Sequence, residues 1–288
     1  MNELVVGVRE IEDERVIAVE GDDARTWLNG QISNDLKKLR PGGTIYGLVL
    51  TSKGRILADL LAFERGGTLF FSTSKDAWPA LRAQLEKFII MEDVSLRETD
   101  LRLFSVVGAR ASELDVAGAL EGLEPTVVAH TRLGPSREVI VDAAALDEAR
   151  QRLGSAAARL GGALLDDAAW ERARIAAGVP RFGRDFGERT YPQEAGLKRR
   201  ALAFDKGCYH GQEVVCMLEN RGQLTRSLVR LELGGATVGP LHHGGDVVGE
   251  ITSASEGAGL GLVKRALAEA GATLETSSGP AKIVGLVS

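Results

Sequence analysis

Between residues 44 and 90, the pattern of apolar and polar positions predicts three strands followed by a helix. The strands are expected at 44–50, 55–62 and 68–73, with a Ser-Lys-Gly turn between the first two. In the segment that follows, apolar side chains recur at spacings of three and four residues, which is typical of one buried helical face. That face consists of Trp78, Leu81, Leu85 and Phe88. This order of elements indicates a mixed α+β region.

A second set of α and β signals follows. The expected strands are 101–108 and 137–141, and helices are expected within 142–162 and 165–178. Asp166 is a suitable cap for the second helix, and Gly178 and Pro180 should stop it. The first 225 residues are therefore expected to form a region of mixed helices and strands.

The pattern changes after residue 226. Short alternating strands are separated by glycine turns, and only one short helical patch is expected, near 264–270. We therefore predict two parts, residues 1–225 and a small all-β domain at 226–288. The "GAGLG" sequence at 257–261 lacks the strand and helix context of a dinucleotide-binding loop, and we interpret it as a β-turn region.

Residues 181–213 show little periodicity of apolar positions. A loop of this length in a compact protein more often has a function than serves only as a connection. The part at 181–206 carries seven basic and four acidic side chains, so its net charge is +3. One interpretation is a solvated loop. The other is a site for a carboxylate- or phosphate-bearing ligand, which arginines can bind with two parallel hydrogen bonds.

The composition narrows the functional classes. The 288 residues carry a net charge of −5, which argues against a general binder of nucleic acid or of anionic membranes. No signal peptide is visible, and no apolar run is long enough to span a bilayer. Two cysteines do not make a disulfide framework, so we expect the reducing cytoplasm.

The sequence "FDKGCYHGQEVV" at 204–215 places Cys208 between two glycines. A thiol reacts as its thiolate, and a cation such as Lys206 or His210 lowers a thiol pKa. Gly207 and Gly211 could adopt positive φ and bring the thiol to the surface. Cys208 could equally be a small buried residue in a turn. The local chemistry leaves both interpretations open.

A permanent metal site is not expected at Cys208. A closed zinc or iron–sulfur site needs three or four ligands, and the local candidates are only Cys208, His210 and Cys216. A second candidate position is Asp59, which interrupts the apolar strand predicted at 55–62. Its carboxylate either faces outward in the strand alternation or points to a ligand.

Six motifs taken together resemble one family. They are "WLNGQISNDL", "SKGRILADL", "RARIAAGVPRFGRDF", "YPQEAGL", "FDKGCYHGQEVV" and "GEITSASEGAGLGLVKRAL". "KGCYHGQE" matches the KGCYxGQE signature of the YgfZ family of folate-binding proteins. This family belongs to the superfamily of the T-protein, the aminomethyltransferase of the glycine cleavage system. The motifs occur in the family's order.

The resemblance implies an α+β fold. It would consist of two intermixed ferredoxin-like α+β subdomains at 1–225 and a C-terminal β-barrel at 226–288. These parts would form a three-leaf ring around a central folate cavity.

The resemblance also implies a function. The chain would be a tetrahydrofolate-binding accessory protein for iron–sulfur cluster assembly or repair, rather than a conventional enzyme. It would support iron–sulfur enzymes such as those that modify tRNA. Its partners would be folate and iron–sulfur proteins or cluster-assembly factors, with no direct contact to nucleic acid or membrane. The alternative is a folate-dependent aminomethyl- or methyltransferase, a one-carbon transferase.

The same resemblance assigns the site residues. Cys208 would be the functional thiol, and Lys206 would favour its thiolate. The remaining signature residues would shape and fix the loop: Gly207, Tyr209, Gly211, Gln212 and Glu213. Three residues would contact the folate, with the arginines attracting its glutamate tail: Asp59, Arg181 and Arg199.

The sequence departs from the T-protein at two places. Ala58 and Asp59 stand where the T-protein has two adjacent aspartates, and Ala176 stands where it has a folate-contacting glutamate. In the T-protein, the missing aspartate and the missing glutamate would hold the pterin ring or assist proton transfer. Their absence from this chain argues against aminomethyl transfer. The T-protein also lacks the cysteine-containing signature.

Overall fold

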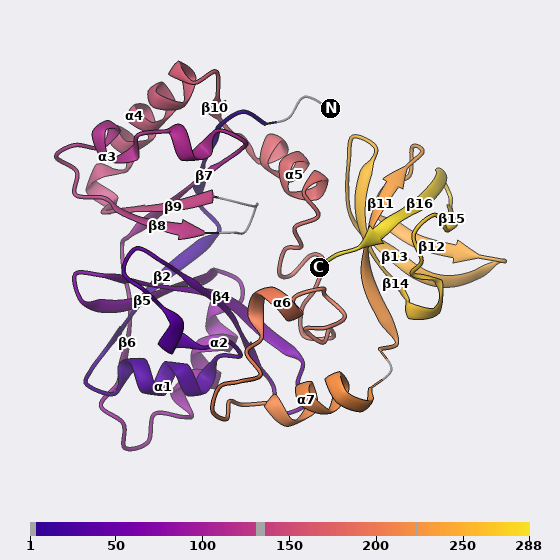
Figure 1. The fold of residues 1–288 in the computed structure, drawn as a ribbon, viewed down its shortest axis with the longest axis horizontal. Coiled ribbons are helices and arrows are strands. Elements are labelled where there is room, and N and C mark those ends of the chain that lie inside the picture. The colour runs from indigo at the N-terminus through magenta and orange to yellow at the C-terminus, as the bar shows by residue number, and fades with distance from the viewer. Residues whose placement is uncertain (1–3, 131–135, 223) are drawn as a thin grey trace. The chain divides into compact units, whose positions relative to one another are not determined.

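The structure is a computed structural model that describes residues 4–130, 136–222 and 224–288. Their strands form two five-stranded sheets and a closed barrel, and helices cover the sheets (Figure 1). The fold is thus of the α+β class, and the predicted C-terminal β-barrel is confirmed. None of the helices in these residues is long and apolar enough to cross a bilayer.

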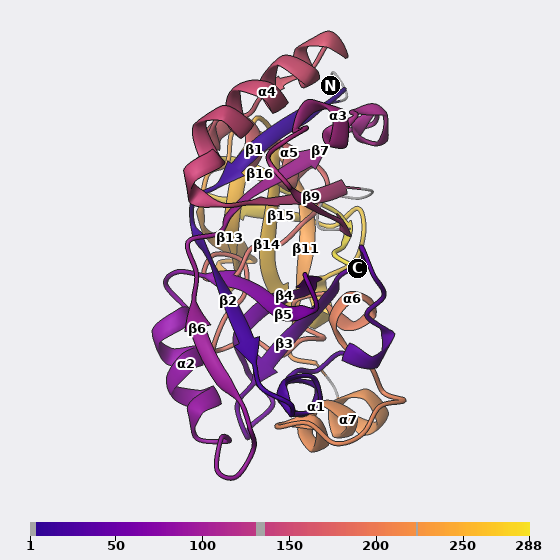
Figure 2. The same ribbon diagram turned by 90° about the vertical axis from the view of Figure 1, so that its left-hand side faces the viewer.

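The first sheet has the order β10-β1-β7-β9-β8. Its strands are β1 (Gly7–Ile11), β7 (Arg102–Val107), β8 (Thr126–His130), β9 (Ser136–Val141) and β10 (Ala163–Leu164). The pairs are antiparallel except for β1 with β10. Helices α3 (Val116–Ala119) and α4 (Leu146–Arg159) cover one side of this sheet (Figure 2). The buried face of α4 has the helical spacing that its sequence predicts: Ala149, Leu153, Ala156 and Ala157.

The second sheet has the order β3-β4-β5-β2-β6. Its strands are β2 (Glu14–Glu20), β3 (Ile45–Leu50), β4 (Ile56–Arg65), β5 (Thr68–Ser74) and β6 (Ser95–Glu98). The predicted order of three strands and a helix is confirmed by β3, β4, β5 and α2 (Trp78–Glu86). The helix packs against the sheet through Trp78, whose ring lies 6.0 Å from that of Phe71. Phe88 lies beyond the end of α2.

The barrel closes in the order β11-β14-β13-β12-β15-β16. Its strands are β11 (Arg226–Leu233), β12 (Gly239–His243), β13 (Asp246–Ser255), β14 (Ala258–Lys264), β15 (Thr273–Thr276) and β16 (Gly279–Leu286). The expected helical patch is a 3-10 turn at Arg265–Leu267. Our interpretation of 257–261 as a turn was wrong beyond Gly257, because Ala258 starts β14. A Cβ at Gly261 would lie 2.9 Å from the carbonyl oxygen of Glu250, so glycine lets β14 lie close to β13.

The remaining helical segments are α1 (Ala24–Gln31), α5 (Asp167–Ala176), α6 (Lys198–Ala201), α7 (Gln212–Arg221) and the 3-10 turns Leu36–Lys38, Ala111–Glu113 and Ala143–Ala145. The predicted cap of α5 is confirmed, because Asp166 accepts a hydrogen bond from the amide of Ala169 at 2.7 Å. Helix α7 was not predicted. Its N-cap is Gly211, which makes no side-chain cap, and its first turn contains two valines.

One compact unit of the chain is assembled from three separate segments: Gly30–Asn34, Gly47–Asp59 and Arg174–Ser288. It contains the barrel, the turn after β3, the "YPQEAGL" sequence and the cysteine signature. The chain therefore brings four of its motif regions into a single body, and the candidate site is built within it.

Candidate functional site

The cysteine signature forms a loop that leads into α7. Cys208 is exposed on this loop. Gly211, the N-cap of α7, has a φ of +80°, which favours glycine, whereas Gly207 does not adopt positive φ. Our expectation for Gly207 was therefore wrong, and a Cβ there would meet no atom within 4 Å. Of these two glycines, Gly211 is therefore the one whose backbone conformation favours glycine.

Lys206 anchors the start of the loop. Its Nζ donates hydrogen bonds to the carbonyl oxygens of Ile32 at 2.8 Å and Asn34 at 2.9 Å. The same ammonium lies 5.2 Å from the centre of the Tyr209 ring, within the range of a cation–π contact. Two of its three donors thus hold the 32–34 segment, which gives Lys206 a positioning role beside Cys208.

Tyr209 and Gln212 close the turn before α7. The amide of Tyr209 donates to Oε1 of Gln212, and the amide of Gln212 donates to the carbonyl of Tyr209, both at 3.2 Å. The Tyr209 side chain is buried, and its hydroxyl has no hydrogen-bond partner among the described residues. Burial raises the pKa of Tyr209, and the charge of Cys216 adds to this effect. Glu213 is exposed in the first turn of α7.

Two glycines from distant parts of the sequence lie against each other. A Cβ at Gly211 would lie 2.4 Å from the carbonyl oxygen of Thr51 and 3.4 Å from the Cα of Gly54. Gly54 itself has a φ of +69°, and a Cβ there would lie 2.9 Å from the side chain of Val214. The "SKGR" turn and the cysteine signature therefore fit together only because both have glycine at this contact.

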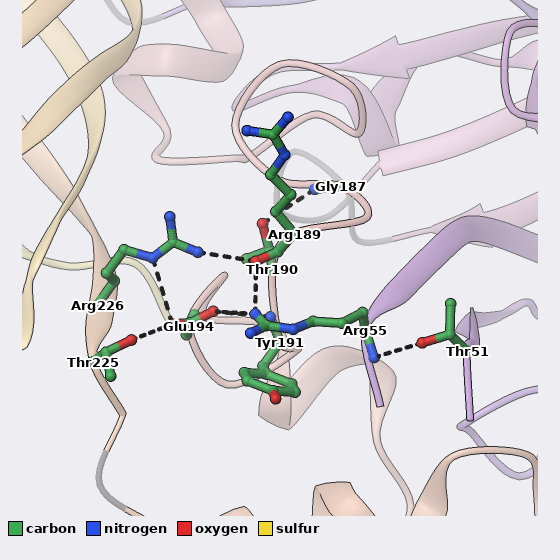
Figure 3. Close-up of polar contacts among 9 residues, drawn as sticks. All are labelled: Thr51, Arg55, Gly187, Arg189, Thr190, Tyr191, Glu194, Thr225 and Arg226. Carbon is green, nitrogen blue, oxygen red and sulfur yellow. Dashed lines mark hydrogen bonds and ion pairs between the residues drawn. The ribbon is translucent and has the colours of Figure 1, made fainter. Parts of the chain in front are cut away.

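Arg55, the residue after Gly54 in this turn, belongs to a charged cluster around Glu194 (Figure 3). The Glu194 side chain is 1% exposed, and its carboxylate accepts hydrogen bonds from Arg55 Nη1 at 3.3 Å and from the amide of Tyr191 at 3.0 Å. Thr225 donates to the other oxygen at 3.2 Å, and Arg226 Nε lies 3.6 Å from it. A carboxylate buried in this way needs such partners, because an unpaired buried charge is costly.

Arg55 is fixed on two further sides. Its guanidinium lies 3.5 Å from the centre of the Tyr191 ring, and its Nη1 donates to the carbonyl of Arg189 at 2.6 Å. Arg226 Nη2 donates to the same carbonyl at 2.9 Å. Two guanidinium groups are thus held against one carboxylate and one carbonyl oxygen.

We did not predict this cluster from the sequence. Arg55, Tyr191, Glu194 and Arg226 come from three segments that are far apart in the chain. The available signal was Glu194, a carboxylate in a predominantly basic segment and within the "YPQEAGL" motif. Its neighbour Gln193 connects this segment to the signature, since its Nε2 donates to the carbonyl of Val215 in α7 at 3.0 Å.

The three residues expected to contact folate lie on separate elements. Asp59 is half-buried in β4 and alternates with the buried Ala58. Arg181 follows α5, and its amide donates to the carboxylate of Asp185 at 3.0 Å. Arg199 is exposed on α6. Among the residues predicted for the site, the structure joins Lys206 to Tyr209 and Tyr209 to Gln212 by direct contacts.

Across residues 4–130, 136–222 and 224–288, no three side chains of His, Cys, Asp or Glu are grouped so that they could hold a metal ion. Both cysteines are free thiols.

Comparison with known proteins places these features in context. The GCVT N-terminal domain family matches residues 3–120. Vibrio vulnificus strain YJ016 has a relative named tRNA-modifying protein YgfZ, which is 27% identical over 223 residues, 75% of this chain and 67% of the relative. A relative of the same name in Serratia proteamaculans is 26% identical over 233 residues, 77% of this chain and 69% of that protein.

A solved structure shows the same fold. The crystal structure of glycine cleavage system aminomethyltransferase T from Bartonella henselae matches with a TM-score of 0.82. The match covers 98% of this chain and 86% of that chain, at 20% identity. The chain therefore has the aminomethyltransferase fold, and its homology to the tRNA-modifying proteins YgfZ confirms the resemblance that the motifs predicted.

Proposed function

We propose that this protein is a tetrahydrofolate-binding accessory protein of the YgfZ kind, with Cys208 as its functional thiol. It would act in the cytoplasm on iron–sulfur proteins or cluster-assembly factors, including those that serve tRNA modification. The names of its homologues support the connection to tRNA modification. The observation that carries the proposal is the exposed Cys208 on a loop that is fixed by contacts on both sides.

The residues around the thiol are arranged for positioning. Lys206 ties the loop to the 32–34 segment, and Gly211 seats it against the turn at Thr51. Tyr209 and Gln212 hold the turn into α7. These contacts leave the Cys208 side chain exposed, and a client protein can approach it there.

The polar groups of this unit fit the chemistry of a folate. A pterin ring presents amino donors and a carbonyl acceptor, and the unit contains a half-buried carboxylate at Asp59. The hydroxyl of Tyr209 and Oε1 of Gln193 are buried and without hydrogen-bond partners in the described chain. Such groups gain stability when a ligand pairs with them. Bound tetrahydrofolate would supply a carrier for one-carbon groups, and Arg181 and Arg199 would attract its carboxylates.

The aminomethyltransferase fold favours a second candidate, a folate-dependent one-carbon transferase. That function needs carboxylates at the reaction centre. Only Asp59 stands where the T-protein has an aspartate pair, and Ala176 replaces its glutamate. An assay that measures release of ammonia and methylene-tetrahydrofolate from an aminomethyl donor distinguishes the candidates, and we expect no turnover.

Calorimetric titration of the protein with tetrahydrofolate tests the ligand, and we expect saturable binding.

Complementation of a strain that lacks its own homologue tests the thiol. Cys208→Ala should keep the melting temperature and folate binding but fail to restore the activity of a tRNA-modifying iron–sulfur enzyme. Cys216→Ala, which removes the half-buried cysteine of α7, is the matched control and should complement. No binding at millimolar tetrahydrofolate, or full complementation by Cys208→Ala, would contradict the proposal.

A further inference from the structure

The cluster around Glu194 contains more positive charge than its carboxylate neutralises. Arg55 and Arg226 both contact Glu194, and the carbonyl that they share belongs to a third arginine, Arg189. The Arg189 side chain is exposed and extends away from Glu194 (Figure 3). Two guanidinium groups thus contact one carboxylate, and a third is exposed on the residue whose carbonyl they share. Three positive charges stand against one negative charge here, on a protein whose net charge is −5.

Many donors of these guanidinium groups are unused. An arginine side chain has five N–H donors and no acceptor. Within the part of the chain that the structure describes, no group accepts from Nε or Nη2 of Arg55, from Nη1 of Arg226 or from the Arg189 guanidinium. The side chains of Arg55 and Arg226 are 31% and 36% exposed, so these donors can reach a ligand from solution.

The guanidinium groups of Arg55 and Arg226 are also held in place by their neighbours. Glu194 is buried and holds the two guanidinium groups, and the ring of Tyr191 supports that of Arg55 from one face. Arginines fixed in this way lose little conformational entropy when they bind an anion. One arginine would neutralise Glu194, but two contact it, and the side chain of Arg189 takes no part in its pairing.

We propose that Arg55, Arg189 and Arg226 form a binding site for a multiply charged oxyanion. Guanidinium groups bind carboxylates and phosphates equally well in geometric terms, since each offers two oxygens to two parallel N–H donors. The choice of ligand rests on the proposed function, because a folate carries a γ-glutamyl tail with one free carboxylate per added glutamate. The site would bind the added glutamates of this tail, beyond the carboxylates that Arg181 and Arg199 would attract. It lies in the same unit as the cysteine signature, and its Arg55 follows directly on Gly54.

The test compares tetrahydrofolate carrying one glutamate with the form carrying five, by calorimetry at low ionic strength. We expect the pentaglutamate form to bind about tenfold more tightly, the factor that one additional charge-assisted contact supplies. Arg189→Gln should reduce this ratio to near one, because it removes an exposed charge without touching the bonds to Glu194. Arg226→Lys keeps the charge but loses the paired donors, so an intermediate ratio is expected. Arg82→Gln, at an exposed position on α2, is the matched control and should leave the ratio unchanged.

Inorganic tripolyphosphate, titrated into the same four proteins, separates this inference from the proposed function. If tripolyphosphate binds, Arg189→Gln weakens this binding and neither folate binds, the oxyanion site is supported and the folate proposal is contradicted. Equal binding of the two folates together with no binding of tripolyphosphate overturns the oxyanion site, while the folate proposal stands. If the pentaglutamate advantage exists but survives in Arg189→Gln and Arg226→Lys, the arginine cluster is not the site.

Discussion

At the scale of single residues, the end of the cysteine loop is seated against Thr51 by Gly211. We expect Gly211→Ala to destabilise the protein by about 1–3 kcal/mol, because alanine is strained at positive φ and its Cβ would meet the carbonyl of Thr51. Urea unfolding measures this difference. Gly207→Ala is the control, since its Cβ would enter open space, and a change within about 0.5 kcal/mol is expected. Equal losses in the two variants would contradict this account.

The buried hydroxyl of Tyr209 gives the stability a specific dependence on pH. Its pKa is raised above the ordinary phenol value of 10.0 by burial. Above that pH the unfolded chain loses the proton while the folded protein keeps it, so the contribution of Tyr209 to stability is complete below pH 10 and declines as the pH rises.

Tyr209→Phe tests this dependence, because it removes the titrating group and keeps the ring. We expect the free energy of unfolding of the original protein to fall more steeply between pH 9.5 and 11 than that of the variant. Below pH 9 the variant should be as stable or more stable, since the hydroxyl that it removes has no partner in the described residues. Parallel pH profiles would show that this phenol is not buried in solution.

Residue-level chemistry could be predicted only where it is local in sequence. The glycines on either side of Cys208 left an exposed thiol and a buried turn residue both open, and the structure places Cys208 at the surface. Which glycine needs positive φ could not be predicted, because that follows from the contact with Thr51, more than 150 residues earlier. The bonds of Lys206 to Ile32 and Asn34 were invisible for the same reason.

At the scale of elements, a buried network connects the end of α5 to barrel strand β13. The carboxylate of Asp185 accepts hydrogen bonds from Arg174 at 2.6 Å, from Thr252 at 2.6 Å and from Ser253 at 2.7 Å. The side chains of Arg174 and Asp185 are 2% and 0% exposed. The network fixes the loop after α5 against the barrel.

Asp185→Asn should therefore destabilise the protein by about 3–5 kcal/mol, because it leaves the guanidinium of Arg174 buried without its counter-charge. Chemical unfolding followed by circular dichroism gives this value. Glu188→Gln neutralises an exposed carboxylate of the same loop and is expected to change stability by no more than about 0.5 kcal/mol. A loss below about 1 kcal/mol for Asp185→Asn would mean that the pair is solvated.

The elements themselves were predicted where apolar periodicity was strong. Helices α2, α4 and α5 and strands β3 to β5 follow their sequence patterns closely. Helix α7 was missed because Gly211 gives no capping signal and the helix has only ten residues. Strand β14 was missed because its first four residues, 258–261, belong to the glycine-rich "GAGLG" sequence, which resembles a turn. In the structure, Gly261 allows β14 to lie close to β13.

At the scale of the whole molecule, the fold could be predicted from the order of the motifs. The six motifs indicated the aminomethyltransferase fold with a C-terminal barrel, and the match to aminomethyltransferase T confirms both. The cluster around Glu194 could not be predicted, because residues 55, 189–194 and 226 meet only after three chain segments fold into one unit. A site of this kind depends on long-range contacts and leaves no short motif.

The anchoring of the cysteine loop has a consequence for how its thiol meets a partner. Lys206 and Gly211 are both fixed, and only four residues lie between them. A span this short has little freedom to swing, so Cys208 cannot travel to a distant acceptor as a mobile arm does. The geometry of the encounter is set by the incoming molecule, which has to bring its reacting atom to a stationary sulfur. A narrow or recessed acceptor would be out of reach, and an exposed one would be favoured.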